Sequence, residues 1–89
     1  MKSEVLTAIA MQVSLQDIRA NKDDIVITDI IKGMDVTIAI DCNCSSVGFD
    51  AYVMNSDNIE LFVRHRFTFL ELETERERLA CKDDHWYFL

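Results

Sequence analysis

Regular alternation of apolar and polar residues across positions 33–54 is the feature that most constrains the fold of this chain. The first half places five residues on one side of a strand: Val36, Ile38, Ile40, Cys42 and Cys44. After Ser45 and Ser46, a second run repeats the pattern: Val47, Phe49, Ala51 and Val53. A side-chain period of two is typical of a strand with one buried face. The pattern therefore predicts two antiparallel strands joined by a short polar loop.

Two further segments favour strands. Residues 25–31 are almost all β-branched, and residues 59–70 alternate as the first pair does. Polar turns separate the segments, and Gly33 lies where the first turn needs a residue that tolerates positive φ. Because neighbouring strands with short connections usually pair, we expect a four-stranded antiparallel meander in sequential order.

The segment 3–20 supports two different predictions. It is rich in helix formers, and Ser3 is a possible N-cap, so amino-acid propensity favours a helix. Residues 11–18, however, alternate between apolar and polar side chains, which favours a strand. We predict a helix in the first part and keep a strand at 11–18 as the alternative.

The C-terminal part is also open to two interpretations. Residues 71–78 form a dense mixed-charge run, ELETERER, that fits either an exposed helix or an extension of the preceding strand. Residues 81–84 resemble a turn. The aromatic segment 85–89, HWYFL, has little reason to lie in water, so we expect it to dock as a final strand.

These elements predict a single α+β domain spanning residues 1–89. Its antiparallel sheet has four to five strands, and the N-terminal helix packs on one face. The alternative is an all-β barrel or sandwich, which requires residues 11–18 to form a strand. A chain of 89 residues has a modest core, so part of its 49% hydrophobic content stays on the surface. That excess favours an oligomer or a standing partner.

The charge balance disfavours direct binding to nucleic acid. Nine basic residues stand against 16 acidic ones, a formal net charge of −7. An acidic surface repels phosphate backbones at long range. The inverse hypothesis is an acidic mimic that occupies a nucleic-acid site on another protein.

The sequence favours a cytoplasmic protein. Three cysteines are too few, and odd in number, for a secreted disulfide framework. Glu4 interrupts the charged start that a signal peptide needs, and the apolar run behind it is short. No stretch approaches the roughly 18–20 apolar residues that span a bilayer, so we expect no membrane association.

Catalytic motifs are absent from the sequence. The two glycines, Gly33 and Gly48, are isolated, so no glycine-rich loop can hold phosphates. There is no HExxH, no CxxC and no G-x-S-x-G. We expect no enzyme activity and no resident cofactor.

Zinc is the one metal that the sequence allows. Cys42, Cys44, Cys81 and His85 offer three sulfurs and one imidazole, a donor set that suits tetrahedral zinc. The geometry of a strand opposes this site, because residues two apart lie ~6.6–6.8 Å from each other along the backbone. Zinc ligation requires the chain at Cys42 and Cys44 to leave the strand. In the alternative, Cys42 continues the core row, and the same spacing disfavours a disulfide between it and Cys44.

Two places could bind a ligand or a partner. Arg64 and Arg66 share one face of a strand and could form a clamp for a carboxylate or another small anion. The alternative pairs them with the chain's own acids, for example Glu60 or the run 71–77. His65, between them, falls on the apolar row and is expected in the core. Trp86 and Tyr87 belong to residue types enriched at binding hot spots, or they cap a small core.

Three hypotheses for function follow. The first is a non-enzymatic, acidic interaction protein that acts by binding another protein, as an inhibitor, adaptor or accessory subunit, with a homodimer as one form. The second is a small zinc-binding module that uses the Cys–His set. The third is a small-anion binder or enzyme that uses Arg64 and Arg66 with His65.

Overall fold

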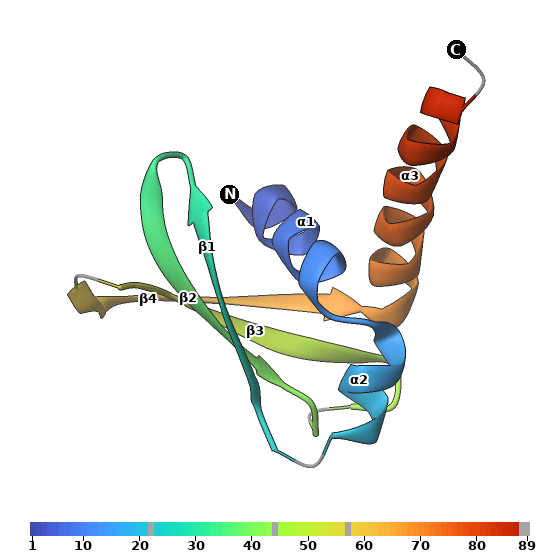
Figure 1. Cartoon of the computed structure of the whole chain (residues 1–89). Helices are drawn as coiled ribbons and strands as arrows, with labels where there is room; N and C mark the ends of the chain where they lie inside the picture. The colour runs from blue at the N-terminus through green and yellow to red at the C-terminus, as the bar shows by residue number, and fades with distance from the viewer. Residues whose placement is uncertain (22, 44, 57, 88–89) are drawn as a thin grey trace.

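A computed structural model describes residues 1–21, 23–43, 45–56 and 58–87 of the chain, without the side chains of residues 58–61 and 82–87. One antiparallel sheet lies against a set of helices (Figure 1). The predicted α+β class is confirmed. The barrel or sandwich alternative is wrong, because the N-terminal segment forms helices and the sheet stays open.

The sheet has four strands in sequential order. They are β1 (Ile25–Ile31), β2 (Met34–Asp41), β3 (Gly48–Asn55) and β4 (Asn58–Thr68). Each strand pairs antiparallel with the next, so the order β1-β2-β3-β4 is the predicted meander. β1 and β4 are therefore the two edges of the sheet.

A two-residue turn fixes the register of β1 against β2. Ile31 pairs with Met34, and between them Lys32 and Gly33 adopt φ values of 52° and 78°. Positive φ at both central positions is what a type I′ hairpin turn needs, and Gly33 meets that need without steric cost. The role predicted for Gly33 is confirmed.

Gly48 has a different purpose at the start of β3. A Cβ atom built there would collide with the backbone carbonyl oxygen of Phe67 on β4. The missing side chain therefore lets β3 and β4 approach each other at the end of this strand pair, next to the start of the C-terminal helix.

The N-terminal segment forms two helices, α1 (Lys2–Gln12) and α2 (Leu15–Ala20). The predicted helix is confirmed and the alternative strand at 11–18 is wrong. Val13, with extended φ and ψ of −133° and 134°, separates the helices, and the hydroxyl of Ser14 then accepts a hydrogen bond from the backbone N–H of Asp17. Ser3 is not the N-cap of α1, because that helix already begins at Lys2.

A single long helix, α3 (Phe69–Tyr87), follows β4 directly. For residues 71–78 the helical alternative is therefore correct. The turn expected at 81–84 is wrong, and so is the strand expected at 85–89 as far as residue 87, since the helix continues to Tyr87. Residues 88–89 lie outside the described residues. Thr68 and Glu71 cap its start, the Thr68 hydroxyl accepting from the Glu71 N–H while the Glu71 carboxylate accepts from the Thr68 N–H.

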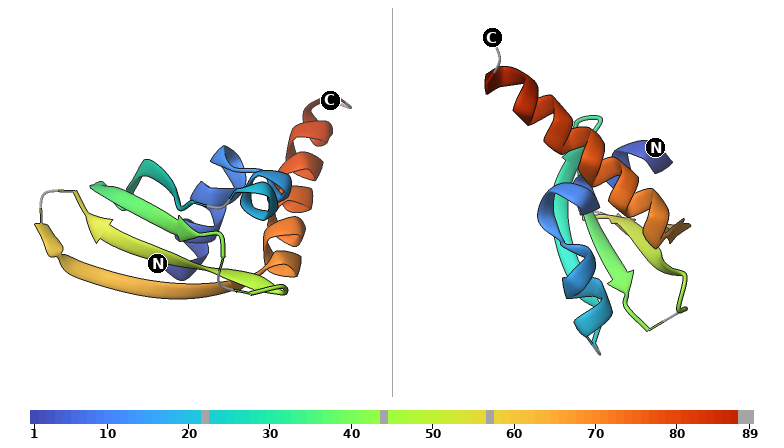
Figure 2. Two further views of the ribbon diagram at one scale, coloured as in Figure 1. Left: turned by 90° about the horizontal axis from the view of Figure 1, so that it is seen from below. Right: turned by 90° about the vertical axis from the view of Figure 1, so that its right-hand side faces the viewer.

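All three helices lie on the same side of the sheet (Figure 2). The core lies between that side and the helices. Its largest fully buried side chains are Phe49, Phe67, Ile9, Ile18, Ile38, Ile40, Leu72 and Val5. The inward rows of β2 and β3 are those that the alternation predicts, and Cys42 packs at the edge of the same core.

Polar contacts join α1 to α3 above this core. The hydroxyl of Thr7 donates to Glu75 over 2.5 Å, and Arg78 donates two hydrogen bonds to the same carboxylate. Arg76 donates to the backbone carbonyls of Ala10 and Val13, which end α1. α1 and the first half of α3 are thereby held together.

Leu72 and Leu70 provide a matched test of this packing. Leu72 is fully buried, whereas Leu70, two residues earlier in α3, is 71% exposed. We expect Leu72→Ala to lower the free energy of unfolding by about 2–5 kcal/mol, because it leaves a cavity in the core. Leu70→Ala should change it by no more than about 0.5 kcal/mol. Urea unfolding measures both, and equal losses would contradict the described position of α3.

Glu75 should make stability depend on pH. Hydrogen bonds from Arg78, and then from Thr7, lower the pKa of its carboxyl from 4.5 to about 2. A lowered pKa in the folded state gives stability that is complete above 4.5 and is lost as the pH falls toward 2. Glu75→Gln should flatten this part of a curve of unfolding free energy against pH. Glu73→Gln, for which no such contact exists among the described residues, is the control.

Candidate functional site: the open sheet face

The face of the sheet that turns away from the helices carries an unusual mixture of side chains. We call this surface the open sheet face. It consists of the outward residues of the four strands: Val26, Thr28, Ile30, Asp35, Thr37, Ala39, Asp41, Asp50, Tyr52, Met54, Phe62, Arg64 and Arg66. Large apolar side chains on this face are exposed to solvent, including Val26, Ile30 and Phe62.

An aromatic cluster lies near the middle of β3 and β4. The ring of Tyr52 stacks on that of Phe62 with 5.1 Å between centroids. The guanidinium of Arg64 lies 6.0 Å from the Tyr52 ring centroid on the same face. Phe62 is nevertheless 53% exposed, so its stacking contact leaves half of the side chain available. The cluster is a preformed, partly hydrophobic surface.

Asp50 lies beside this cluster and binds both arginines. Its carboxylate accepts from Arg64 Nη2 over 2.7 Å and from Arg66 Nε over 3.0 Å. These two side chains cover Asp50, which is 2% exposed although it lies on the open sheet face. The hydrogen bonds, that from Arg66 first, hold the pKa of Asp50 below its ordinary value of 3.8.

The sequence analysis includes a pairing of Arg64 and Arg66 with an acidic residue of the same chain, but it does not name Asp50 as that residue. Asp50 was missed, while Glu60 and the run 71–77 were named. The register explains the choice, because Asp50 lies directly opposite Arg66 and two pairs away from Arg64, on the same face. A sequence signal did exist, since Asp50 shares its face of the β3 strand with Tyr52, and folding β3 onto the next strand brings it to the arginines.

The predicted anion clamp is therefore already engaged. Arg64 and Arg66 do lie side by side, as the alternation predicts, with exposed side chains. Their described hydrogen bonds go to one internal carboxylate. An added anion would have to compete with Asp50 for the two guanidinium groups.

The predicted zinc ligands are described only in part. Cys42 packs against the core and Cys81 is exposed on α3, and neither thiol is in a disulfide. The backbone N–H of Phe69, where α3 begins, donates a hydrogen bond to the carbonyl of Val47 in the β2–β3 loop. Cys81 lies roughly 18 Å further along the helix axis, a separation that indicates no close approach to this loop. Cys44 and the side chain of His85 lie outside the described residues. Within the described part of the chain no group of three candidate ligands occurs, and zinc stays a prediction.

The remaining predicted residues lie elsewhere. His65 is on the core side of β4, as expected, with its ring 6.1 Å from that of Phe67, and burial followed by the charge of Lys2 lowers its pKa. Trp86 and Tyr87 are in the last turn of α3, but their side chains lie outside the described residues.

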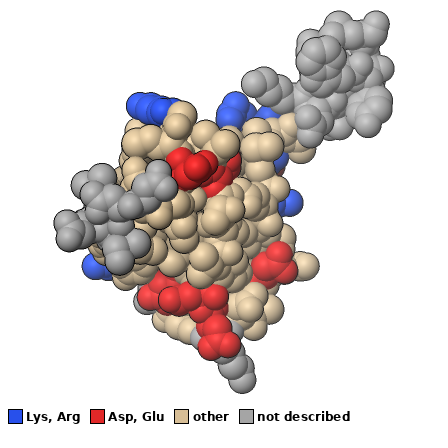
Figure 3. All heavy atoms as spheres, turned by 60° about the vertical axis from the view of Figure 1, so that its left-hand side comes forward, with Lys and Arg blue, Asp and Glu red and all other residues tan. Residues whose placement is uncertain are grey.

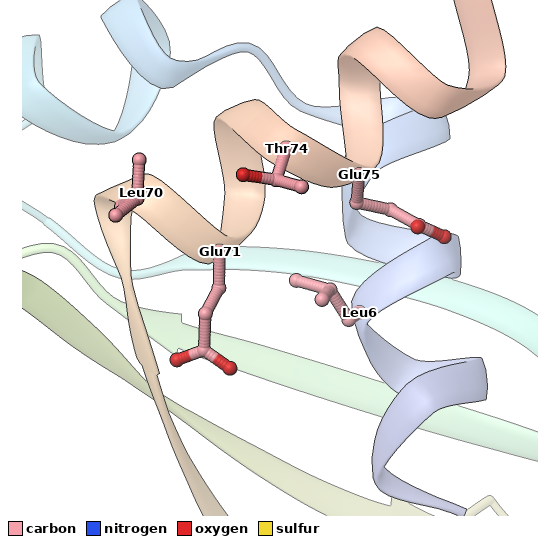
Figure 4. Close-up of a pocket in the computed structure, with 5 residues that line it drawn as sticks. All are labelled: Leu6, Leu70, Glu71, Thr74 and Glu75. Carbon is pink, nitrogen blue, oxygen red and sulfur yellow. The ribbon is translucent and has the colours of Figure 1, made fainter.

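The hollows of the described surface are small and open. One lies between α1 and α3 and is lined by Leu6, Leu70, Glu71, Thr74 and Glu75 (Figure 4). Leu6 points across from α1 toward α3, and the carboxylate of Glu71 is already used to cap the helix. This hollow has no set of converging catalytic groups, so the open sheet face is the better candidate site.

Charge on the surface is gathered in patches. Figure 3 shows acidic groups in separate clusters on the face that it draws, with a broad uncharged area between them and Lys and Arg nearer the margins.

No helix in the described part of the chain is long and apolar enough to cross a membrane.

Comparisons of the chain with protein-family models, with curated proteins and with solved structures found no match.

Replacing Asp50 tests the site's electrostatics. Because its pKa is lowered in the folded state, its charge contributes stability above about pH 3.8 that is lost as the pH falls below that value. We expect Asp50→Asn to lower the unfolding free energy at pH 7 and to reduce its decline on acidification. Asp35→Asn, an exposed aspartate on the same face, is the control. Identical pH profiles for Asp50→Asn and the unaltered chain would refute the ion-pair description.

Proposed function

We propose that this chain is a non-enzymatic interaction protein that acts by binding a protein through the open sheet face. The observation that carries the proposal is the cluster of half-buried Tyr52 with exposed Phe62 and Arg64, on a sheet face that no helix of the described residues covers. The partner is a different protein or a further copy of the chain.

The composition of the face supports this proposal. Tyr and Arg are enriched at binding hot spots, and Phe and Met at the centres of interfaces. Here Tyr52, Met54, Phe62 and Arg64 are neighbours in the register of β3 and β4. Apolar side chains continue toward the other edge of the sheet with Ala39 and Val26.

The order of the cluster also favours binding. Arg64 is held by Asp50 on one side and Tyr52 on the other, and Tyr52 is held by Phe62. Side chains that are fixed before binding lose less conformational entropy when a partner packs on them. The cluster is therefore prepared for contact, although its side chains remain accessible.

Substitutions on this face should abolish capture of a partner. We expect Phe62→Glu and Tyr52→Glu each to remove captured proteins, because each replaces an aromatic contact by a carboxylate that loses its hydration when a partner packs on it. Met11→Glu is the control, since Met11 is 71% exposed on α1, on the helical side. Tagged variants are immobilised and exposed to a lysate of the native host that also contains the untagged chain.

Mass spectrometry then identifies what each variant retains. Proteins held by the unaltered chain and by Met11→Glu, but lost from both face variants, agree with the proposal. Retention that is unchanged in Phe62→Glu and Tyr52→Glu would contradict it, provided that thermal unfolding shows both variants to be folded.

A further inference from the structure

The register of the sheet places residues of opposite charge at equal distances on either side of β3. Asp50 of β3 pairs with Asp41 on β2 and with Arg66 on β4. Two pairs further along, on the same face, Tyr52 lies between Ala39 and Arg64. The flank on β2 is thus acidic or small, and the flank on β4 is basic.

The acidic flank of one copy can face the basic flank of a second copy that is related to it by a two-fold rotation. A two-fold axis parallel to β3, lying above the open sheet face, places β4 of one copy over β2 of the other. Arg66 of each copy then faces Asp41 of the other, and this contact occurs twice. A two-fold interface uses the same surface patch on both subunits, so each favourable contact is repeated.

The centre of the same contact is apolar. Tyr52 and Met54 lie on β3 and would each meet their counterparts at the axis, with Phe62 of one copy above Thr37 of the other. Two faces packed in this way form a sandwich with aligned strands and ~10 Å between the sheets. The two Asp50 carboxylates also approach each other, but each is covered by the arginines of its own chain.

The area of the face indicates the strength of the contact. Four strands ~4.8 Å apart and about seven residues long give a face of roughly 20 by 23 Å. This is smaller than the ~800 Å² per partner of a standard interface. Each copy also carries a net charge of −7, which opposes association. Both the small area and the net charge favour weak association, so the dimer is to be sought at high protein concentration.

We propose that the partner of the open sheet face is a second copy of this chain, bound face to face about a two-fold axis parallel to β3, with Arg66 of each copy opposite Asp41 of the other. This inference rests on the proposed function and names the partner of that surface. A different protein on the same face is the competing outcome of the test.

Exchanging charges tests the proposed pairing. In Asp41→Arg both contacts join two arginines, and in Arg66→Asp both join two aspartates. An equimolar mixture of the two variants restores two opposite-charge contacts in each mixed dimer. Sedimentation velocity from about 5 to 500 µM at ~0.15 M salt should show at least tenfold weaker association for each variant and recovery in the mixture.

Two further variants keep the test independent of folding. Arg66→Asp also removes a partner of Asp50, so its fold is checked by thermal unfolding. If it does not fold, Asp41→Arg and Tyr52→Glu decide, since both keep Asp50, Arg64 and Arg66 in the chain and both are checked by thermal unfolding in the same way. Both should weaken association at least tenfold, and Met11→Glu should leave it unchanged.

The results separate this inference from the proposed function. An unaltered chain that stays monomeric at 500 µM overturns the dimer, as does a mixture of folded variants that associates no better than either variant by itself. If a different host protein is then captured through Tyr52 and Phe62, the proposed function stands and the second copy is wrong. If no capture depends on these residues, both fail.

Discussion

A β-sheet has two faces, and the helices of this chain cover one of them. α1, α2 and the first half of α3 supply the apolar side chains that bury the inward rows of β2 and β3. This single layer of contacts contains the core, with Phe49 at its centre against both Phe67 and Phe69. Everything on the other face must be tolerated by water or covered by a neighbour. The candidate site follows from that constraint.

On the open sheet face, side chains of the chain itself cover part of what the helices leave uncovered. Asp50 lies on the outward side of β3, and Arg64 and Arg66 cover its carboxylate. The two arginines thus cover the one deeply buried carboxylate among the described residues of this face, and Phe62 beside them stays exposed.

The sequence contains most of the information on the sheet, because strands with one buried face have a period of two. Val36, Ile38 and Ile40 identify β2 and its inward side without any other input. The bounds of the helices are harder to predict from the sequence, since they depend on short capping motifs. Ser14 with Asp17, and Thr68 with Glu71, have the spacing of capping boxes and mark where α2 and α3 begin.

The C-terminal segment shows where such reasoning fails. Its aromatic composition favours a strand, but the helix that begins at Phe69 continues through residues 81–87. The site was predicted in part, since Arg64 and Arg66 were identified and their bond to Asp50 was not. Alternation gives the face on which a residue lies, whereas the register between strands decides which residues meet. The register depends on turn geometry and on close approaches such as that at Gly48.

The order of the strands has a consequence for how the chain folds. Every strand pairs with its neighbour in sequence, so each hairpin can form from residues that are close along the chain. The contacts between Thr7 and Glu75, and between Arg76 and the end of α1, join residues more than 60 positions apart. Closing the two ends over the sheet therefore carries the main loop-closure cost. The meander can assemble before that closure, and for that interval both of its faces, not one, are open to other chains.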